Sequence, residues 1–554
     1  MTENENKLQI IPLGGLGEVG KNMMVVRYNN EILVIDSGLM FPEDELLGID
    51  IVIPDMSYLQ ENKDIIKGII LTHGHEDHIG AMPYVLKELN VPVYGTKLTL
   101  GILKEKLKEG NVNDAKLITI RSRDHVKLGV FKIDVFKVSH SIPDAIGMAI
   151  HTPVGTILHT GDFKFDQTPV DGVTTDFSRI SGIGEKGVLV MLSDSTNVER
   201  PGFTPSEKTV GQFFEDTFRL ARERIIVASF ASNVHRIQSV INAAYKYNRK
   251  VAIVGRSMVN VASIAQDTGY LTIPDDTLIE IEEIANYPRN RVAILTTGSQ
   301  GEPMSALTRI AMSDHRRVEI IPGDTVIISA TPIPGNEKLV ARTVNQLFRL
   351  GAEVIHESTS GMHVSGHASQ EELKMMINLV HPKFFVPVHG EYRHLVKHAH
   401  LAEQLGIPKE NIFLAENGQI LEFTAKTGTV GGRVTAGRIL IDGLGIGDVG
   451  NIVLRDRKQL SQDGILIVVV TINKAENALI AGPDIVSRGF VYVREAEKLM
   501  DESREIVKTV LDKCFDRKIT DWASIKSQVR DTLGKQLYEK TGRRPMIIPI
   551  IMEI

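Results

Sequence analysis

Cysteine is almost absent from this chain: Cys514 is the single one among 554 residues. An intrachain disulfide is therefore impossible, and a reducing cytoplasm is the expected compartment. No apolar run approaches the roughly 20 residues needed to span a bilayer. Residues 1–7 are polar and mostly acidic, which excludes a signal peptide there. We interpret Cys514, far from every motif, as structural and expect no membrane association.

An excess of positive charge is missing as well. The chain has 63 Lys and Arg against 69 Asp and Glu, a net charge of −6. A non-specific nucleic-acid binder is usually basic overall, so the composition disfavours that class. A local basic channel, or bound metal ions that supply positive charge, stays compatible with it. The length predicts about three to four domains, and the composition is that of ordinary globular proteins.

Three successive patterns of strands and helices divide the chain. The first third predicts strands at 8–13, 22–28, 31–36, 67–72, 92–94, 131–138, 146–151 and 154–160, with helices at 81–89 and 98–108. The next part alternates helices 206–222, 235–248 and 258–269 with strands 224–229, 250–254 and 292–296, which indicates a parallel α/β unit. The last part predicts strands 464–471, 489–493 and 546–554 and helices 495–515 and 521–540.

Residues 15–20, Gly-Leu-Gly-Glu-Val-Gly, match the dinucleotide-binding pattern G-x-G-x-x-G, and Asp36 supplies a later acid. That pattern requires a helix directly after the glycines. A β-type segment, 22–28, follows instead. We therefore predict a tight turn between strands, not a nucleotide site.

The strongest signal is His-Gly-His-Glu-Asp-His at 73–78, directly after the apolar strand 67–72. Imidazole and carboxylate are the ligands that zinc and similar cations prefer. A polar, solvated loop is the alternative. The cluster predicts ligands His73, His75, Asp77 and His78, with Glu76 turned toward solvent.

Further ligand candidates stand at the ends of other predicted strands. His140 follows 131–138, Asp162 follows 154–160 beside a glycine, and His389 follows the apolar run 384–388. A single histidine is more often an ordinary hydrogen-bonded residue, but joint occurrence at strand ends favours a shared site. The short acid Asp162 suits a bridging carboxylate, and His159 competes with it from the opposite side of its strand.

These residues resemble the ligand series of the metallo-β-lactamase superfamily. Segments 193–197, 297–304 and 363–370 resemble its β-CASP nucleic-acid-processing branch, and the whole chain is similar to bacterial ribonuclease J. The resemblance implies an α/β protein: an αββα sandwich from 1–206 and 370–425, an inserted β-CASP α/β domain at 207–369, a linker at 426–450 and a small α/β oligomerisation domain at 451–554. No ligand position is replaced, so nothing indicates an inactive paralogue.

The resemblance also implies roles for individual residues. One metal takes His73, His75 and His140, the second takes Asp77, His78 and His389, and Asp162 bridges them. Asp77, His363 and Asp194 form the catalytic set: Asp194 orients a ligand histidine, and His363 serves the leaving oxygen. The alternatives are a turn-stabilising Asp194 and a loop-stabilising His363. The RNA 5′-phosphate is bound by two segments: Ser232, Asn233, Val234, and His363, Val364, Ser365, Gly366, His367.

The activity implied is that of a metal-dependent ribonuclease, with 5′→3′ exonuclease and endonuclease action in RNA maturation and decay. Its cofactors are two Zn²⁺ per subunit, with Mn²⁺ or Mg²⁺ as alternatives, and its substrate is single-stranded RNA with a 5′-monophosphate. A homodimer or tetramer, alone or with a paralogue, is expected in the cytoplasm. Lactamase-like or glyoxalase-like hydrolases, a non-catalytic RNA-binding scaffold and a DNA nuclease are the rivals. The motifs themselves contain nothing that reads a 2′-hydroxyl.

Overall fold

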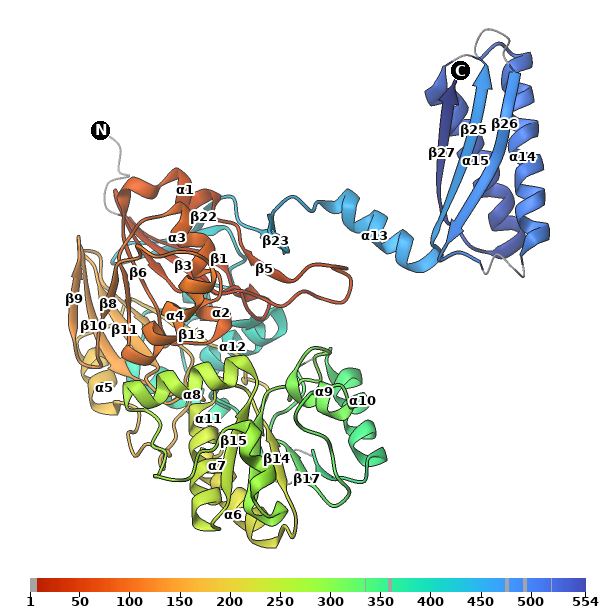
Figure 1. Cartoon of the computed structure of the whole chain (residues 1–554). Helices are drawn as coiled ribbons and strands as arrows, with labels where there is room; N and C mark the ends of the chain where they lie inside the picture. The colour runs from red at the N-terminus through yellow and green to blue at the C-terminus, as the bar shows by residue number, and fades with distance from the viewer. Residues whose placement is uncertain (1–6, 334, 357–360, 474–477, 492–495, 520) are drawn as a thin grey trace, which may run out of the picture. The chain divides into compact units, whose positions relative to one another are not determined.

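The structure is a computed structural model that describes every residue except 1–6, 334, 357–360, 474–477, 492–495 and 520. The chain forms two compact units (Figure 1): residues 1–41 with 51–439, and residues 42–50 with 440–554. Within the described residues, no helix has the length and apolarity that a membrane crossing needs.

Two sheets face each other in the first unit. The larger has the order β22 (Gly428–Arg433), β21 (Gln419–Phe423), β1 (Leu8–Gly14), β3 (Met23–Tyr28), β4 (Glu31–Ile35), β6 (Ile66–Ile70), β7 (Val93–Gly95), β8 (Leu117–Thr119). The smaller has the order β19 (Phe384–Val388), β13 (Val190–Asp194), β12 (Thr156–His159), β11 (Ile146–His151), β10 (Phe131–Lys137), β9 (His125–Leu128). Buried side chains from both, such as Ile10, Leu33, Phe131 and Ile150, form one continuous core. Their packing confirms the expected sandwich.

Helices cover the outer faces of both sheets (Figure 1). On the larger sheet lie α1 (Ser57–Glu61), α3 (Met82–Glu88) and α4 (Lys97–Glu109). The smaller sheet packs through a second core against α5 (Phe177–Glu185), α11 (Gln370–Val380) and α12 (Tyr392–Gln404). Short pieces β2 (Leu16–Gly17), β20 (Gly390–Glu391), β5 (Ile51–Pro54), α2 (Glu76–Ile79), η1 (Lys63–Ile65) and η5 (Lys409–Asn411) complete this part.

The glycine-rich segment 15–20 is a turn, as predicted. Gly15, Gly17 and Gly20 have φ of 88°, 74° and 106°, in the region that disfavours other residues. The following element is strand β3, with no helix after the glycines. The dinucleotide interpretation is therefore excluded by the backbone itself.

The inserted α/β part leaves the sandwich after β13 and returns at β19. Its five parallel strands run in the order β15 (Lys250–Val254), β16 (Val292–Thr296), β14 (Ile225–Ala228), β17 (Thr325–Ile328), β18 (Glu353–Ile355). Its helices are α6 (Glu207–Leu220), α7 (Val234–Lys246), α8 (Arg256–Thr268), α9 (Ala306–Ala311) and α10 (Glu337–Arg349), with short turns η2 (Ile281–Asn286) and η3 (Arg289–Arg291). The parallel unit confirms the helix–strand alternation of the sequence.

The insertion explains how residue 389 reaches the first third of the chain. β13 and β19 are parallel neighbours, with Asp194 opposite Val388. The whole inserted part therefore enters and leaves at one edge of the sandwich. Because carboxyl ends of parallel neighbours meet, His389 follows β19 at the place where Asp194 ends β13.

The second unit contains α13 (Asn451–Asp463), a sheet in the order β26 (Ala478–Arg488), β25 (Ile465–Asn473), β27 (Met546–Glu553), and two long helices, α14 (Glu497–Asp516) and α15 (Trp522–Thr541). Buried Cys514 belongs to its core, as expected. The predicted strand 489–493 is wrong over 489–491, which has no strand structure, and its last two residues lie outside the described residues. The expected linker 426–450 holds the strands β22, β23 (Arg438–Asp442) and β24 (Gly445–Ile446).

Candidate active site

Seven side chains from distant parts of the sequence converge at one edge of the sandwich. They follow β6, β10, β12 and β19, because each strand ends where a loop can turn its side chains inward. His75 caps α2, so Asp77 and His78 lie in the first turn of that helix. Among the described residues, donor atoms lying within 4.8 Å of one another form three groups, and two of them contain only predicted ligands: His73, His75, His140, and Asp77, His78, Asp162, His389.

The first group contains only imidazoles. His75 Nδ1 lies 2.9 Å from His73 Nε2 and 3.1 Å from His140 Nε2. His140 Nδ1 lies 2.8 Å from the carbonyl oxygen of Gly366, so that nitrogen must carry the hydrogen and donate it. Nε2 of neutral His140 is then unprotonated, and its lone pair points to His75. Three ring nitrogens that converge in this way match the donor set of a bound cation.

The second group mixes imidazoles with carboxylates. His78 Nε2 lies 3.2 Å from Asp162 Oδ2 and 3.5 Å from Asp77 Oδ2. His389 Nε2 lies 3.3 Å from Asp77 Oδ2 and 3.5 Å from Asp162 Oδ2. Asp162 also comes within 3.8 Å of His73 and 3.9 Å of His140. The buried Asp162 carboxylate is therefore the one group close to both sets of donors, which suits a bridging ligand.

Electrostatics separates the two groups. Burial, together with neighbouring imidazoles, holds the pKa of His73 and His140 well below the usual value and lowers that of His75 to about 4. Burial also lowers the pKa of His78 and His389, but the facing carboxylates, first among them Asp162, outweigh it and raise both well above the usual value. In the second group the carboxylates therefore favour positive charge at the place that fits a cation.

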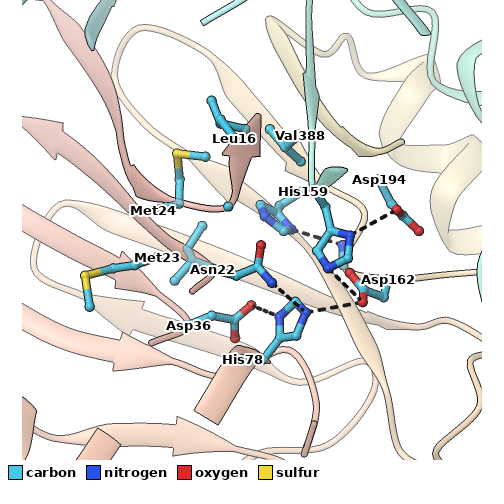
Figure 2. Close-up of a pocket in the computed structure, with 15 residues that line it drawn as sticks. Leu16, Asn22, Met23, Met24, Asp36, His78, His159, Asp162, Asp194 and Val388 are labelled. Carbon is cyan, nitrogen blue, oxygen red and sulfur yellow. Dashed lines mark hydrogen bonds and ion pairs between the residues drawn. The ribbon is translucent and has the colours of Figure 1, made fainter. Parts of the chain in front are cut away.

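Asp36 orients His78 from behind, a role that the sequence did not reveal. Its carboxylate accepts hydrogen bonds from Thr72 N at 2.7 Å, Thr72 Oγ1 at 2.8 Å and His78 Nδ1 at 2.8 Å. His78 Nδ1 therefore carries the hydrogen, and Nε2 faces the other donors. Figure 2 shows His78 between Asp36 and Asp162. The available signal was an acid at the end of a strand, 31–36, beside the motif strand 67–72.

Asp194 and His367 form the wall next to His389. Asp194 Oδ2 lies 2.8 Å from His367 Nδ1, and its Oδ1 accepts a 2.8 Å hydrogen bond from Thr196 Oγ1. Thr196 Oγ1 in turn lies 2.6 Å from His389 Nδ1. Burial raises the pKa of Asp194, but the charge of His367 and the hydrogen bonds from His367 and His389 together outweigh it, so the net direction is downward. Asp194 Oδ1 also lies 3.5 Å from His389 Nδ1, so Asp194 reaches His389 both directly and through Thr196, and it holds His367 directly.

His367, and not His363, joins the ligand residues. His367 belongs to a third donor group with Asp162, Asp194 and His389. His363 is half-buried, and its Nδ1 is bound to Arg236. The sequence placed both histidines in the phosphate-binding loop and did not predict that His367 lies among the ligand residues.

The remaining predicted residues lie around this centre. Ser232, Asn233 and Val234 form the start of α7, where the Asn233 side chain accepts a hydrogen bond from Arg236 N. Ser365 Oγ accepts a 2.7 Å hydrogen bond from Asn197 Nδ2. Val364 and Gly366 are buried.

Glu76 and His159 stay outside the ligand groups, in agreement with the sequence. Glu76 is 45% exposed and pairs with Lys106 at 2.5 Å. His159 Nδ1 accepts a 3.0 Å hydrogen bond from Gly161 N. With Leu16 and Val388, His159 lines a cavity of about 20 Å³ beside the second group (Figure 2), which is room for roughly one water molecule.

Two relatives align with this chain over its whole length. Ribonuclease J2 from Bacillus subtilis (strain 168) is 49% identical over 553 residues, covering 100% of both chains. The chain belongs to the ribonuclease J family. Ribonuclease J 2 from Staphylococcus aureus (strain NCTC 8325 / PS 47) is 47% identical over 556 residues, again with 100% of both chains covered.

Family descriptions match consecutive parts of this ribonuclease J family member. They are the metallo-beta-lactamase superfamily over 16–188, the ribonuclease J beta-CASP domain over 222–347, the Zn-dependent metallo-hydrolase RNA specificity domain over 352–414 and the ribonuclease J C-terminal domain over 452–554. A crystal structure of a protein of unknown function from Enterococcus faecalis V583 shares the fold, with a TM-score of 0.53 and 17% identity, over 75% of this chain and 100% of that one.

Proposed function

We propose that this ribonuclease J family member is a metal-dependent ribonuclease that cleaves phosphodiester bonds, as a 5′→3′ exonuclease and as an endonuclease. The observation that carries the proposal is the pair of donor groups that share the Asp162 carboxylate. Two such groups side by side suit the hydrolysis of an anionic ester better than that of a neutral amide.

The donor chemistry fits two divalent cations, zinc first, with manganese and magnesium as alternatives. His73, His75 and His140 would hold one, Asp77, His78 and His389 the other, and Asp162 both. Such cations, when bound, supply Lewis acidity and activate water near neutral pH. The name Zn-dependent metallo-hydrolase for the matched segment 352–414 supports zinc.

The chain's own residues orient this centre. Asp36 keeps the hydrogen of His78 on Nδ1, and the carbonyl of Gly366 does the same for His140. Thr196, held by Asp194, contacts His389 Nδ1. Each contact fixes the orientation of its ring, so that the other ring nitrogen points inward to the place of the cation.

RNA with a 5′-monophosphate is the proposed substrate. Ser232–Val234 stands at the N-terminus of helix α7, a common phosphate-binding position. The loop His363–His367 provides small residues and two imidazoles, with His363 as a donor to a phosphate oxygen and Asp194 as the residue that fixes the adjacent His367. Anchoring the terminal phosphate favours exonuclease action, whereas RNA lying across the centre without that anchor is cut internally.

End-labelled substrates test this function. Purified protein with Zn²⁺, Mn²⁺ or Mg²⁺ is given RNA bearing a 5′-monophosphate, triphosphate or hydroxyl, and the matching DNA. We expect RNA cleavage with faster exonuclease release from the monophosphate. His75→Ala and Asp77→Ala should reduce it strongly. Full activity of either variant would contradict the ligand assignment. Equal rates on all 5′ ends would contradict the proposed binding of the 5′-phosphate, and faster cleavage of DNA would show that DNA is the better substrate.

The domain division and assembly remain proposals. We place metallo-β-lactamase parts at 1–206 and 370–425, the β-CASP domain at 207–369, the linker at 426–450 and an oligomerisation domain at 451–554. We also propose that the protein forms a homodimer or tetramer in the cytoplasm, alone or with a paralogue. On β27, Ile548, Ile550 and Met552 are 39%, 41% and 49% exposed on one face, which supports a contact surface there. Ile550→Asp should lower the mass measured by light scattering, and an unchanged mass would contradict this surface.

A further inference from the structure

A fully buried arginine, Arg236, joins the two segments assigned to RNA phosphate. It lies in the first turn of α7, two residues after Val234, and none of its surface is exposed. Its Nη1 donates to the carbonyl oxygen of Ser329 at 2.6 Å and lies 3.0 Å from His363 Nδ1. Burying a guanidinium costs folding free energy unless its charge is paired and its N–H groups are hydrogen-bonded, so the partners of Arg236 decide whether its burial is tolerated.

Glu207 fixes the orientation of this guanidinium. Its carboxylate accepts from Arg236 Nε at 2.9 Å and from Nη2 at 3.2 Å, a fork-like pair that leaves Nη1 for Ser329 and His363. Glu207 is itself tied to the sandwich, because its backbone N–H donates to Asp166 Oδ2 at 3.1 Å. Arg236 is therefore held rigidly from both the inserted part and the sandwich.

The contact with Arg236 determines where the hydrogen of His363 resides. Arginine has donors only, so His363 Nδ1 must accept. The hydrogen of the neutral ring is then on Nε2. The charged groups that face His363 are Arg236, Arg200 and Lys164, all positive, and they act with burial, the largest cause, to lower its pKa to about 3. The ring stays neutral at physiological pH.

We propose that Arg236 is a positioning residue that keeps His363 in the neutral form with hydrogen on Nε2, so that this N–H donates to a phosphate oxygen of RNA. This inference rests on the proposed ribonuclease function and deepens it. A neutral His363 differs from a protonated one in one respect: its N–H donor is present at every pH from about 5 to 9, because the ring gains and loses no proton in that range.

Histidine NMR tests the tautomer without any change at Arg236. Metal-loaded, full-length protein with ¹⁵N-labelled histidine gives the tautomer of each ring, and His363→Asn identifies the signal. We expect hydrogen on Nε2 and no titration between pH 5.5 and 8. A ring with hydrogen on Nδ1, or one that titrates near its ordinary value of about 6.5, overturns the proposal.

Kinetics tests the consequence for RNA. Removing Arg236 alone would leave Glu207 as an unpaired buried charge, so the variant is Arg236→Gln with Glu207→Gln. We expect kcat/KM on 5′-monophosphorylated RNA to fall roughly 10-fold at pH 8. Because the loss of the Arg236 charge raises the pKa of His363, although burial still lowers it, the ring becomes a protonated donor more readily in acid, and the deficit relative to wild type should shrink as the pH falls. A deficit independent of pH indicates a merely structural role and contradicts the proposal.

A matched control and a double-mutant cycle separate the remaining explanations. Arg224 and Asp324 form another buried pair in the inserted part, at 2.6 Å, without contact to His363. Changing both to neutral amides should lower thermal stability without this pH signature. In the His363→Ala background, the Arg236 and Glu207 changes should cost nothing further. An equal cost there removes coupling through His363, whereas wild-type activity of His363→Ala alone would show that the assigned RNA role of His363 has failed.

Discussion

The two donor groups at the centre of this molecule are adjacent but differ in chemistry. The first, His73, His75 and His140, has only nitrogen donors, whose pKa values are lowered. The second adds the carboxylates of Asp77 and Asp162, which raise the pKa of its histidines. The first group is therefore ready for a cation at neutral pH, whereas the second must give up protons to receive one.

Asp162 should be the most sensitive position, because it is close to both groups. Asp162→Asn keeps the shape but removes the charge, so we expect both cations to bind weakly and RNA hydrolysis to fall about a thousand-fold or more. Metal analysis and single-turnover hydrolysis measure the effect. His140→Ala, the comparison variant, should empty the first group alone. If Asp162→Asn still bound one cation with unchanged affinity, the Asp162 carboxylate would be a ligand of the second group only.

A change at Asp36 should lower the metal affinity of the second group alone, although Asp36 belongs to neither group. Asp36→Asn weakens the acceptor that orients His78, so metal affinity of the second group should drop about 10- to 100-fold, while the first keeps its affinity. Metal-competition titration of the purified variant provides the measurement. Equal weakening of both groups would mean that Asp36 supports the whole edge of the sheet instead of one ligand.

Proton release offers a pH test of the same contrast. In the metal-free protein the raised pKa of His78 and His389 keeps both protonated at pH 7, so loading the second group should release about one proton from each. The release should diminish as pH rises through those pKa values. The first group, already deprotonated, should release almost none. Potentiometric titration of wild type and His140→Ala separates the two, and equal release from both groups would contradict the assignment.

Glu76 should have the smallest effect, although it lies within the same six residues. Its partly exposed pair with Lys106 is worth at most about 1 kcal/mol of unfolding free energy. Glu76→Gln should leave metal content and hydrolysis unchanged, as measured by the assays above. A large loss would show that the helix start at residue 76 has a role in the ligand geometry.

The ligand residues were predictable because each is a metal-binding type at the end of a recognisable strand. Local sequence cannot show what lies across a sheet, and for that reason Asp36 escaped: its partner His78 is far along the chain and meets it only when β4 and β6 pair. The contact of His367 with Asp194 was not predicted for a similar reason, since the side of the loop that faces Asp194 is set by tertiary contacts.

Strand boundaries in the second unit show a different limit. β26 begins at Ala478 and includes Gly482 and Pro483, residues that are unfavourable inside strands, so its sequence gives no strand pattern. The apolar run that starts at Gly489 resembles a strand but has no such structure over 489–491. Pairing with the long neighbour β25 overrides local preference.

The carbonyl of Gly366 has a consequence for how the enzyme is measured. It orients His140, and a Cβ at this glycine would lie 2.7 Å from the imidazole, so the loop His363–His367 and the first group cannot move independently. If RNA binds that loop as proposed, thermodynamic reciprocity requires it to change the metal affinity by the same factor by which the metal changes the RNA affinity. A dissociation constant for RNA measured without metal, or for metal measured without RNA, therefore differs from the constant of the complete complex.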